Sequence, residues 1–230
     1  MNLIIFGANG PTGRLLTQQA LMAGHNVRAL TRRPEAFPVQ HERLEVIHGD
    51  VYDAPTVDAA TEGTDAVLSV LGVPYSRHTI NVYSQGIQNI LKAMTRGQVR
   101  RLLCVTSSSV ALHPDPQAGL FSRLVFPFVI GVLGKTTYDD MRRMEALVRA
   151  SPLDWTIVRP SGLFSSSGVT PYLLGENFVS EHFTSRLDLA DSMLRQLSSD
   201  HYIRRVMAVV TTAEKPNILQ FIRQEVFKRP

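Results

Sequence analysis

Seven short apolar runs, separated by amphipathic stretches, constrain the fold of this chain more than any other feature of the sequence. Most runs are apolar at every position, which is typical of parallel strands that are covered on both faces. We expect strands over residues 3–6, 27–30, 44–47, 66–71, 102–106, 155–158 and 206–210. Helical periodicity lies over 12–23, 54–62, 79–97, 136–150, 187–198 and 216–227. This repeated strand–helix order predicts an α/β fold with a doubly wound parallel sheet.

The chain contains no Pro-, Gly- or Ser-rich linker and no internal repeat, so we expect one domain over residues 1–230. Two segments, 111–134 and 161–186, depart from the strand–helix alternation. They follow the fifth and sixth predicted strands, at the edge of the sheet where such folds bind ligands. We therefore expect these insertions to form the walls of a substrate pocket. Their aromatic side chains, such as Phe121, Phe164 and Tyr172, would either line this pocket or pack in the core.

The charge pattern argues against a nucleic-acid partner. The net charge is +4 and the pI is near 9.5, but the lysines and arginines are scattered and form no stripe interleaved with aromatic residues. The apolar segment 119–134 contains Arg123 and Pro127 and falls short of the ~20 residues of a spanning helix. We expect no membrane span there, and instead a buried segment, a lid or an oligomer contact, which leaves a homodimer open.

The cysteine and histidine content argues against two kinds of site, an internal disulfide and a metal centre. Cys104, in the apolar run LLCVTS, is the one cysteine of the chain, so no internal disulfide is possible and a buried core thiol is expected. The seven histidines show no spacing typical of metal ligands, so no metal site is expected. The chain opens on a strand without a signal-peptide pattern, and we expect a cytoplasmic protein.

The segment GANGPTGR, residues 7–14, follows the first predicted strand and opens a helix near Pro11 or Thr12. Gly7 would allow a sharp turn, Gly10 would let the backbone approach a pyrophosphate, and Gly13 would let the helix pack closely on the sheet. The phosphate would lie against free N–H groups at the positive end of the helix dipole. The residues expected to bind a dinucleotide here are Gly7, Asn9, Gly10, Pro11, Thr12 and Gly13.

The residues at the end of the second predicted strand indicate whether the site would bind NAD or NADP. In this fold an acidic residue there binds the ribose 2′-hydroxyl of NAD, whereas an arginine accommodates a 2′-phosphate. The sequence has Thr31, Arg32 and Arg33 at this place, and a guanidinium forms bidentate hydrogen bonds with phosphate. We expect NADP(H), with a solvated surface pair as the alternative role for the two arginines.

The third and fourth predicted strands supply further candidates. Asp50 and Val51, in HGDVYD, fall where the adenine would lie, Asp50 as an acceptor for the exocyclic amine and Val51 as an apolar face. Asp50 could instead cap the helix that starts near Ala54. Leu71 and Gly72, in VLGVP, are expected to line the middle of the cofactor.

With these segments in view, the chain resembles the atypical short-chain dehydrogenase/reductase superfamily, on the branch of NmrA-like and biliverdin reductase B (flavin reductase)-like proteins. The resemblance covers nearly the whole chain and rests on the segments GANGPTGR, TRRP, HGDVYD, VTSSS, DMRRMEALVRASPLDWTIVRPSGL and FTSRLDLADSML. It implies a Rossmann domain with a small C-terminal substrate-binding part and NADP(H) as the cofactor.

The resemblance also implies roles for residues after the fifth and sixth strands. Ser108 falls at the catalytic serine position, and Thr106 and Ser107 would lie beside the nicotinamide. Ser107 could equally form a local turn. In RPSGLF, Arg159 and Pro160 would close the sixth strand, and Ser161 to Leu163 would place backbone groups near the carboxamide. Pro160 and Ser161 are therefore further candidates for cofactor binding.

The helix KTTYDDMRRMEAL departs from the Tyr-x-x-x-Lys pattern of the superfamily. The tyrosine position holds Thr137 and the lysine position holds Met141, whereas Tyr138 and Arg142 stand one residue out of frame. A shift of one residue turns a helical side chain by about 100°. Tyr138 is therefore either a proton donor or an ordinary residue of an amphipathic helix.

Two functions are compatible with this pattern. The first is an NADPH-dependent reductase that transfers hydride to a planar conjugated acceptor, such as a flavin, a quinone or a related carbonyl compound, with the proton taken from solvent. The second is a non-catalytic NADP(H)-binding redox sensor of the NmrA-like type, which the missing Tyr/Lys pair favours.

Overall fold

The computed structural model describes residues 1–76, 78–111, 134–180 and 183–213. The helix predicted over 216–227, the side chain of Phe121 and nearly all of the segment 111–134 lie outside the described residues. In the described part of the chain, no helix has both the length and the apolar character that crossing a bilayer requires.

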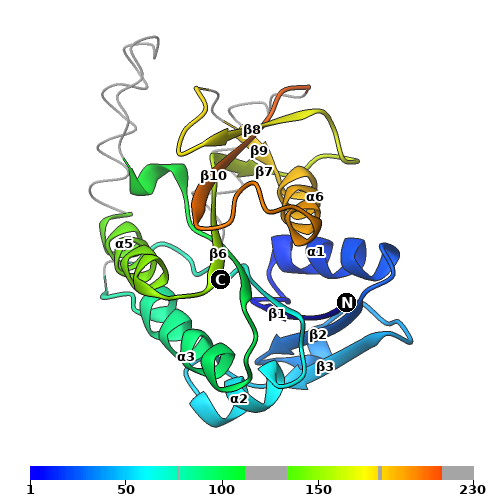
Figure 1. Ribbon diagram of the computed structural model, residues 1–230. Coiled ribbons are helices and arrows are strands. Elements are labelled where there is room, and N and C mark those ends of the chain that lie inside the picture. The colour runs from blue at the N-terminus through cyan, green and yellow to red at the C-terminus, as the bar shows by residue number, and fades with distance from the viewer. Residues whose placement is uncertain (77, 112–133, 181–182, 214–230) are drawn as a thin grey trace.

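An eight-stranded sheet forms the centre of the molecule, with the strand order β3-β2-β1-β4-β5-β6-β10-β8 (Figure 1). All of its neighbouring strands pair in parallel except β8, which runs antiparallel to β10 at one edge. The strands are β1 (Asn2–Phe6), β2 (Asn26–Thr31), β3 (Leu44–His48), β4 (Ala66–Ser69), β5 (Arg101–Val105), β6 (Asp154–Pro160), β7 (Gly162–Phe164), β8 (Tyr172–Glu176), β9 (Phe183–Ser185) and β10 (Arg205–Thr211). The predicted doubly wound parallel sheet of Rossmann type is therefore confirmed.

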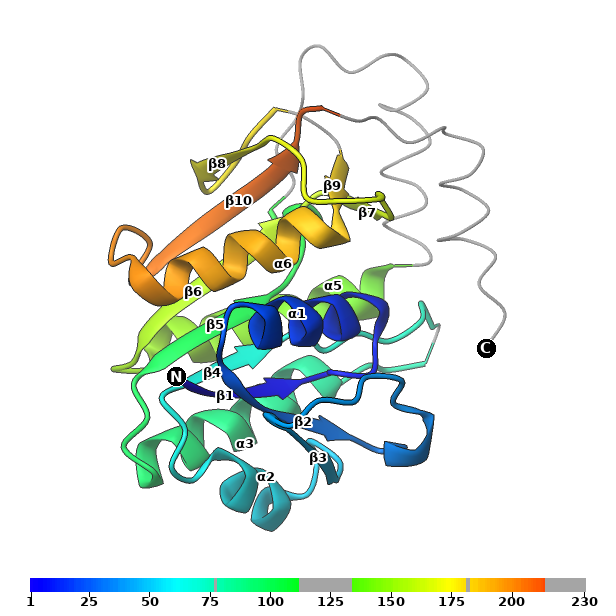
Figure 2. The ribbon, with the colours of Figure 1, turned by 90° about the vertical axis from the view of Figure 1, so that its right-hand side faces the viewer.

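Helices cover both faces of this sheet (Figure 2). The helices are α1 (Pro11–Met22), α2 (Ala54–Thr61), α3 (Val82–Arg96), α5 (Lys135–Ala150) and α6 (Arg186–Arg195). α1 and α6 pack on one face, and α2, α3 and α5 pack on the other. Short 3₁₀ turns lie at η1 (Pro34–Ala36), η2 (Ser108–Val110) and η3 (Gln196–Ser198).

The continuous apolar strands supply two separate cores. In β1, Leu3 and Ile5 pack with α1 and α6, whereas Ile4 and Phe6 pack with α2, α3 and α5. Because successive side chains of a strand point to opposite faces, a strand between two helical layers needs apolar residues at every position. This explains why the sequence shows solid runs instead of alternation.

Three strands were not predicted from the sequence, and all lie within the segment 161–186. β7 and β9 pair in parallel as a separate two-stranded sheet, and β8 adds to the edge of the main sheet. β7 and β9 have three residues each, too few to show a periodicity, and β8 contains Gly175 and Glu176, which are uncommon in strands. The described part of this segment therefore forms regular strand structure beside α6.

A buried carboxylate joins α3 to α5. Asp140 of α5 is fully buried and accepts hydrogen bonds from the backbone N–H groups of Tyr83 and Ser84, at 2.9 and 3.3 Å, and from the Ser84 hydroxyl. Arg143 donates to the same carboxylate at 3.0 Å. Asp140 therefore caps the N-terminus of α3 from another helix, and Asn81, at the N-cap position, makes no side-chain capping bond.

We expect Asp140→Ala to lower the free energy of unfolding by about 2 kcal/mol, because two N–H groups in the first turn of α3 lose their acceptor. Urea unfolding followed by circular dichroism measures this change. Asp139 provides the matched control, since it lies on the same helix but forms only the more exposed ion pairs with Lys135 and Arg142. Asp139→Ala should cost less than about 0.5 kcal/mol, and an equal loss in both variants would contradict the capping role.

Candidate functional site

The predicted cofactor residues converge on one edge of the sheet. They follow the carboxyl ends of β1 to β6, six strands that lie side by side in the order β3-β2-β1-β4-β5-β6. The strand order reverses between β1 and β4, which is the switch point where open α/β sheets bind their ligands. The structure thus gathers segments that are up to about 150 residues apart in the chain.

The loop between β1 and α1 turns sharply at Gly7, as predicted. Gly7 has a φ of +80°, and a Cβ atom there would lie 2.6 Å from the carbonyl oxygen of Val70 at the end of β4. The loop is closed by a hydrogen bond from the Gly10 N–H to the Gly7 carbonyl at 3.1 Å. Only glycine allows this positive φ together with so close an approach to β4.

Gly10 and Gly13 have different surroundings. A Cβ atom on Gly13 would lie 2.2 Å from the Gly7 carbonyl oxygen and 2.6 Å from that of Ala8. Gly13 therefore packs against its own loop, whereas the sequence predicted close packing on the sheet. A Cβ atom on Gly10 would meet only the Gly7 carbonyl oxygen, at 3.3 Å, and would otherwise project into open space.

The start of α1 fits a diphosphate. Pro11 stands in the first turn, and no described side chain caps this N-terminus. The first N–H groups of a helix have no partner within the helix and carry its positive dipole end, which favours an anion. The open space at Gly10, the missing cap and the position at the switch point together match the pyrophosphate of a dinucleotide.

Arg32 and Arg33 follow β2 with exposed side chains. The Arg33 N–H donates to the Thr31 hydroxyl at 3.2 Å, which fixes the start of the loop. Neither guanidinium pairs with a carboxylate of the described chain, so both remain available to an anion. Arg14, which sequence reasoning did not single out, reaches the same region from α1, because its Nη2 donates to the Ala36 carbonyl at 3.4 Å.

Asp50 does not cap α2. Asp53 takes the N-cap position, and Asp50 instead accepts a hydrogen bond from the Tyr52 N–H at 3.1 Å, in a turn that precedes the helix. The capping alternative for Asp50 is therefore wrong. Val51 is 4% exposed and packs against Gly86 of α3, so its side chain belongs mainly to the core.

Tyr52 is a further residue of this edge that the sequence did not reveal. Its hydroxyl donates to Asn81 Oδ1 at 2.8 Å, and its ring is 43% exposed. Burial raises the pKa of Tyr52, and the nearby carboxylates of Asp50 and Asp140 raise it further, whereas the positive charge of Arg32 lowers it. The Arg32 guanidinium therefore acts on the loop that follows β3.

The residues after β4 and β6 frame the middle of the edge. Leu71 is half-buried against the core, and a Cβ atom on Gly72 would meet nothing within 4 Å. Pro160 ends β6, and the N–H of Ser161 donates to the Thr184 hydroxyl at 2.9 Å, which joins β6 to β9.

A buried ion pair occupies the interior beside β5. Arg159 donates to Glu145 in a bidentate pair, with distances of 2.9 and 2.6 Å, and both side chains are buried. The Thr106 hydroxyl donates at 2.8 Å to Glu145 Oε1, the oxygen that also accepts from Arg159 Nε. The Thr106 side chain is thus engaged in a link between β5, β6 and α5, and the sequence had placed it beside the nicotinamide.

Ser107 forms a local turn. Its hydroxyl accepts a hydrogen bond from the Ser109 N–H at 3.2 Å and caps the short turn η2. The turn interpretation of Ser107 is therefore correct. Ser108, the predicted catalytic serine, begins η2 and is half-buried at the carboxyl end of β5.

Tyr138 lies within the core beside α3, with 6% of its surface exposed. Its hydroxyl is 2.8 Å from the hydroxyl of Tyr75, which is 48% exposed on the loop that follows β4. Thr137 and Met141, at the Tyr and Lys positions of the superfamily, are also buried. The Thr137 hydroxyl has no hydrogen-bond partner among the described residues.

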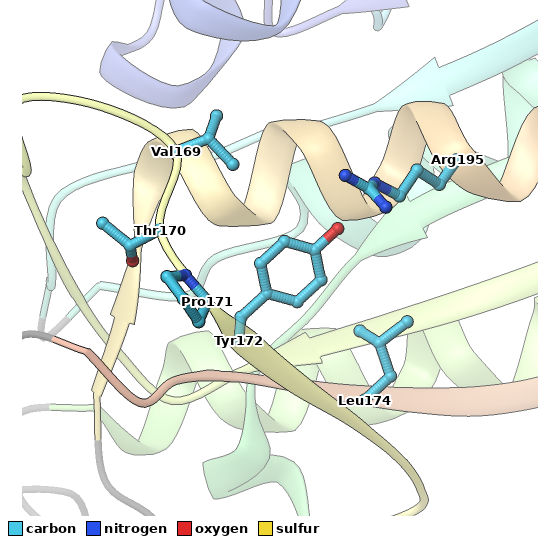
Figure 3. Close-up of a pocket in the computed structure, with 6 residues that line it drawn as sticks. All are labelled: Val169, Thr170, Pro171, Tyr172, Leu174 and Arg195. Carbon is cyan, nitrogen blue, oxygen red and sulfur yellow. The ribbon is translucent and has the colours of Figure 1, made fainter.

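A hollow with a volume of about 510 Å³ lies between β8 and α6. Figure 3 shows the Tyr172 ring directed toward α6, where Arg195 lies over it at 5.9 Å. Tyr172 donates to Asp191, and burial together with this hydrogen bond raises the pKa of its phenol. The lining residues are Val169, Thr170, Pro171, Tyr172, Leu174 and Arg195. None of them belongs to the predicted cofactor residues, so the hollow is a separate feature of segment 161–186.

Metal and thiol chemistry have no support in the described part of the chain. Its His, Cys, Asp and Glu side chains form no group that could hold a metal ion. Cys104 is fully buried, as expected for a core thiol, and burial raises the pKa of its thiol.

Comparisons with known proteins agree with this geometry. A family model described as NAD(P)H-binding matches residues 7–200. A short-chain dehydrogenase/reductase from Veillonella parvula, solved in complex with NADP, has a TM-score of 0.77 and 19% sequence identity, covering 94% of this chain and 99% of its own. This likeness shows that the two proteins share a fold.

Two curated relatives share part of the sequence. A 3 beta-hydroxysteroid dehydrogenase/Delta 5-->4-isomerase of Mycobacterium tuberculosis is 31% identical over 128 residues, which are 51% of this chain and 34% of that protein. A (4-alkanoyl-5-oxo-2,5-dihydrofuran-3-yl)methyl phosphate reductase of Streptomyces griseus is 28% identical over 165 residues, 72% of this chain and 49% of that protein. The chain thus spans between a third and a half of the length of these relatives.

The different surroundings of Gly10 and Gly13 lead to opposite expectations for two variants. Gly10→Val should leave the unfolding temperature nearly unchanged but abolish NADPH binding, because the added side chain fills the space next to the α1 N-terminus. Gly13→Ala should instead lower the free energy of unfolding by about 2 kcal/mol, because its Cβ atom overlaps two backbone carbonyls. Thermal unfolding and NADPH fluorescence separate the two effects, and retained binding in Gly10→Val would place the pyrophosphate elsewhere.

Proposed function

The chain belongs to the NAD(P)H-binding family, and from this premise we propose that it is an NADPH-dependent reductase of a planar conjugated acceptor. The observation that carries the proposal is the edge formed by the open glycine loop and by Arg32 and Arg33, which have no carboxylate partner among the described residues. Family membership supports an NAD(P)H-dependent oxidoreductase, and the nature of the acceptor is the step beyond it.

The preference for NADPH over NADH rests on the loop after β2. Arg32 and Arg33 replace the carboxylate that would bind the ribose 2′-hydroxyl of NADH. Glu35, the nearest acidic residue in the chain, follows Pro34 within the turn η1. Two guanidinium groups without carboxylate partners in the described chain favour a 2′-phosphate dianion.

When it is bound, NADPH supplies a hydride, which together with one proton reduces the acceptor and leaves NADP+. The residues of this chain orient the two molecules: the glycine loop holds the diphosphate, and the backbone around Ser108 and Ser161 lines the nicotinamide end. The proton comes from solvent or from Tyr138, whose hydroxyl lies 2.8 Å from that of the partly exposed Tyr75. The protein then contributes orientation more than acid–base chemistry.

The acceptor class is supported by the printed name of one relative. The Streptomyces griseus reductase is named for a (4-alkanoyl-5-oxo-2,5-dihydrofuran-3-yl)methyl phosphate, in which the ring double bond is conjugated with a carbonyl group and the phosphate is charged. The conjugated ring of such an acceptor, or of a flavin or quinone, would pack against an apolar wall. The segment 161–186 would supply part of this wall, with Phe164 and Leu163 near the carboxyl end of β6.

A non-catalytic redox sensor is the second candidate. It is favoured by one observation. Thr137 and Met141, both buried, replace the tyrosine that passes a proton to the substrate and the lysine that lowers the pKa of this tyrosine in typical members of the superfamily. A sensor must bind NADP+ and NADPH with different affinities, since only a differential affinity shifts an equilibrium.

We expect NADPH fluorescence to change on mixing with the protein, and the nicotinamide absorbance to fall after addition of FMN, menadione or an alkanoyl-dihydrofuranone. The Gly10→Val variant serves as the control and should show neither effect. Binding without protein-dependent oxidation of NADPH by any of these acceptors would contradict the reductase and favour the sensor. A comparison of the NADP+ and NADPH affinities would then test the sensor directly.

Replacement of Arg32 and Arg33 by alanine together should weaken NADPH binding by about 100-fold, because two charge-assisted hydrogen bonds to the 2′-phosphate are lost. NADH binding should change by less than about 3-fold, since its ribose carries no phosphate. Fluorescence titration of both cofactors measures the ratio. Equal losses for NADPH and NADH would show that the arginines do not contact the 2′-phosphate.

A further inference from the structure

Arg14 connects the two loops that surround the adenosine ribose in this fold. Its Nε donates to Asn9 Oδ1 at 2.9 Å, in the glycine loop, and its Nη2 donates to the Ala36 carbonyl at 3.4 Å, in the turn after β2. The glycine loop holds the pyrophosphate and the end of β2 meets the ribose. The Arg14 guanidinium therefore lies between the diphosphate side and the 2′ side of the ribose.

The positive charge of Arg14 has no carboxylate partner among the described residues. Other arginines are paired, for example Arg28 with Glu45 and Arg205 with Glu176. Arg14 is half-buried, and its Nη1 group donates to no described residue. A guanidinium has five N–H donors and stays charged, so this side chain keeps donors for a phosphate.

Arg32 and Arg33 belong to the same predicted cofactor site as Arg14, but a different element carries them. The Arg32 charge acts on Tyr52, which follows β3 on the adenine side. Arg33 is held by its backbone bond to Thr31 and stays at the end of β2. Arg14 approaches from α1, on the diphosphate side, whereas Arg32 and Arg33 come from the end of β2.

We propose that Arg14 binds the 2′-phosphate of NADPH and is a specificity-determining residue of the cofactor site. The proposal rests on the proposed use of NADPH. Its two hydrogen bonds to Asn9 and Ala36 fix the guanidinium before the cofactor arrives, which reduces the entropy lost on binding. A lysine would lack this fork of donors and would offer only a point charge.

The test compares Arg14→Gln with the parent chain for two pairs of ligands, NADPH with NADH and 2′,5′-ADP with 5′-AMP. We expect affinity for NADPH and 2′,5′-ADP to fall by about 10- to 100-fold, which is the effect of one charge-assisted contact. NADH and 5′-AMP should change by less than about 3-fold. Fluorescence titration measures the reduced cofactors, and calorimetry measures the adenosine fragments.

Two control variants distinguish a direct contact with the phosphate from a general charge effect and from a change in the glycine loop. Lys92→Gln removes one positive charge from the exposed side of α3, across the sheet from α1, and should leave all four affinities unchanged. Asn9→Ala removes the hydrogen-bond acceptor of Arg14 in the glycine loop. If Arg14 acted only by holding this loop, Asn9→Ala would reproduce the effect of Arg14→Gln, and both would weaken NADPH and NADH equally.

The outcomes separate this inference from the proposed function. Equal losses for the phosphorylated and unphosphorylated ligands, or no loss, would overturn the role of Arg14 alone. A parent chain that binds NADPH and NADH equally would overturn both the NADPH preference and the role of Arg14. Failure of every acceptor to oxidise NADPH would overturn the reductase and leave the binding comparison intact, because the adenosine fragments need no turnover.

Discussion

Parallel pairing of seven strands is the constraint on which the rest of the molecule depends. It requires crossover helices on both faces, and it therefore demands strands that are apolar at every position. It also brings the carboxyl ends of all these strands to one edge. The glycine loop, the arginines after β2 and the serines after β5 meet there because of this geometry, although the chain separates them widely.

Two buried carboxylates of α5 then hold α3, β5 and β6 in place. Asp140 fixes the first turn of α3, and Glu145 fixes β5 and β6 through Thr106 and Arg159. Both carboxylates are satisfied by several donors, as buried charges must be. The helix that carries the catalytic pair in typical members of the superfamily is thus anchored here by two buried carboxylates.

The sequence was sufficient to predict the seven main strands, the five described helices and the turn at Gly7, because apolar period and glycine spacing are local signals. It could not place contacts that depend on the tertiary fold. The cap that Asp140 gives to α3, the pairing of Tyr75 with Tyr138, and the bridge that Arg14 makes from Asn9 to Ala36 all join distant segments. The strands β7 and β9 escaped prediction because they are too short to show a period.

The link from Glu145 to Arg159 has a consequence for how such sequences are interpreted. The segments DMRRMEAL and DWTIVRP carry much of the resemblance, yet one charged residue of each, Glu145 and Arg159, pairs with the other in the interior of the protein. A sequence match that depends on these segments detects the scaffold. Two chains that share them can therefore carry out unrelated chemistry, and transfer of a reaction name between them needs agreement at the exposed edge instead.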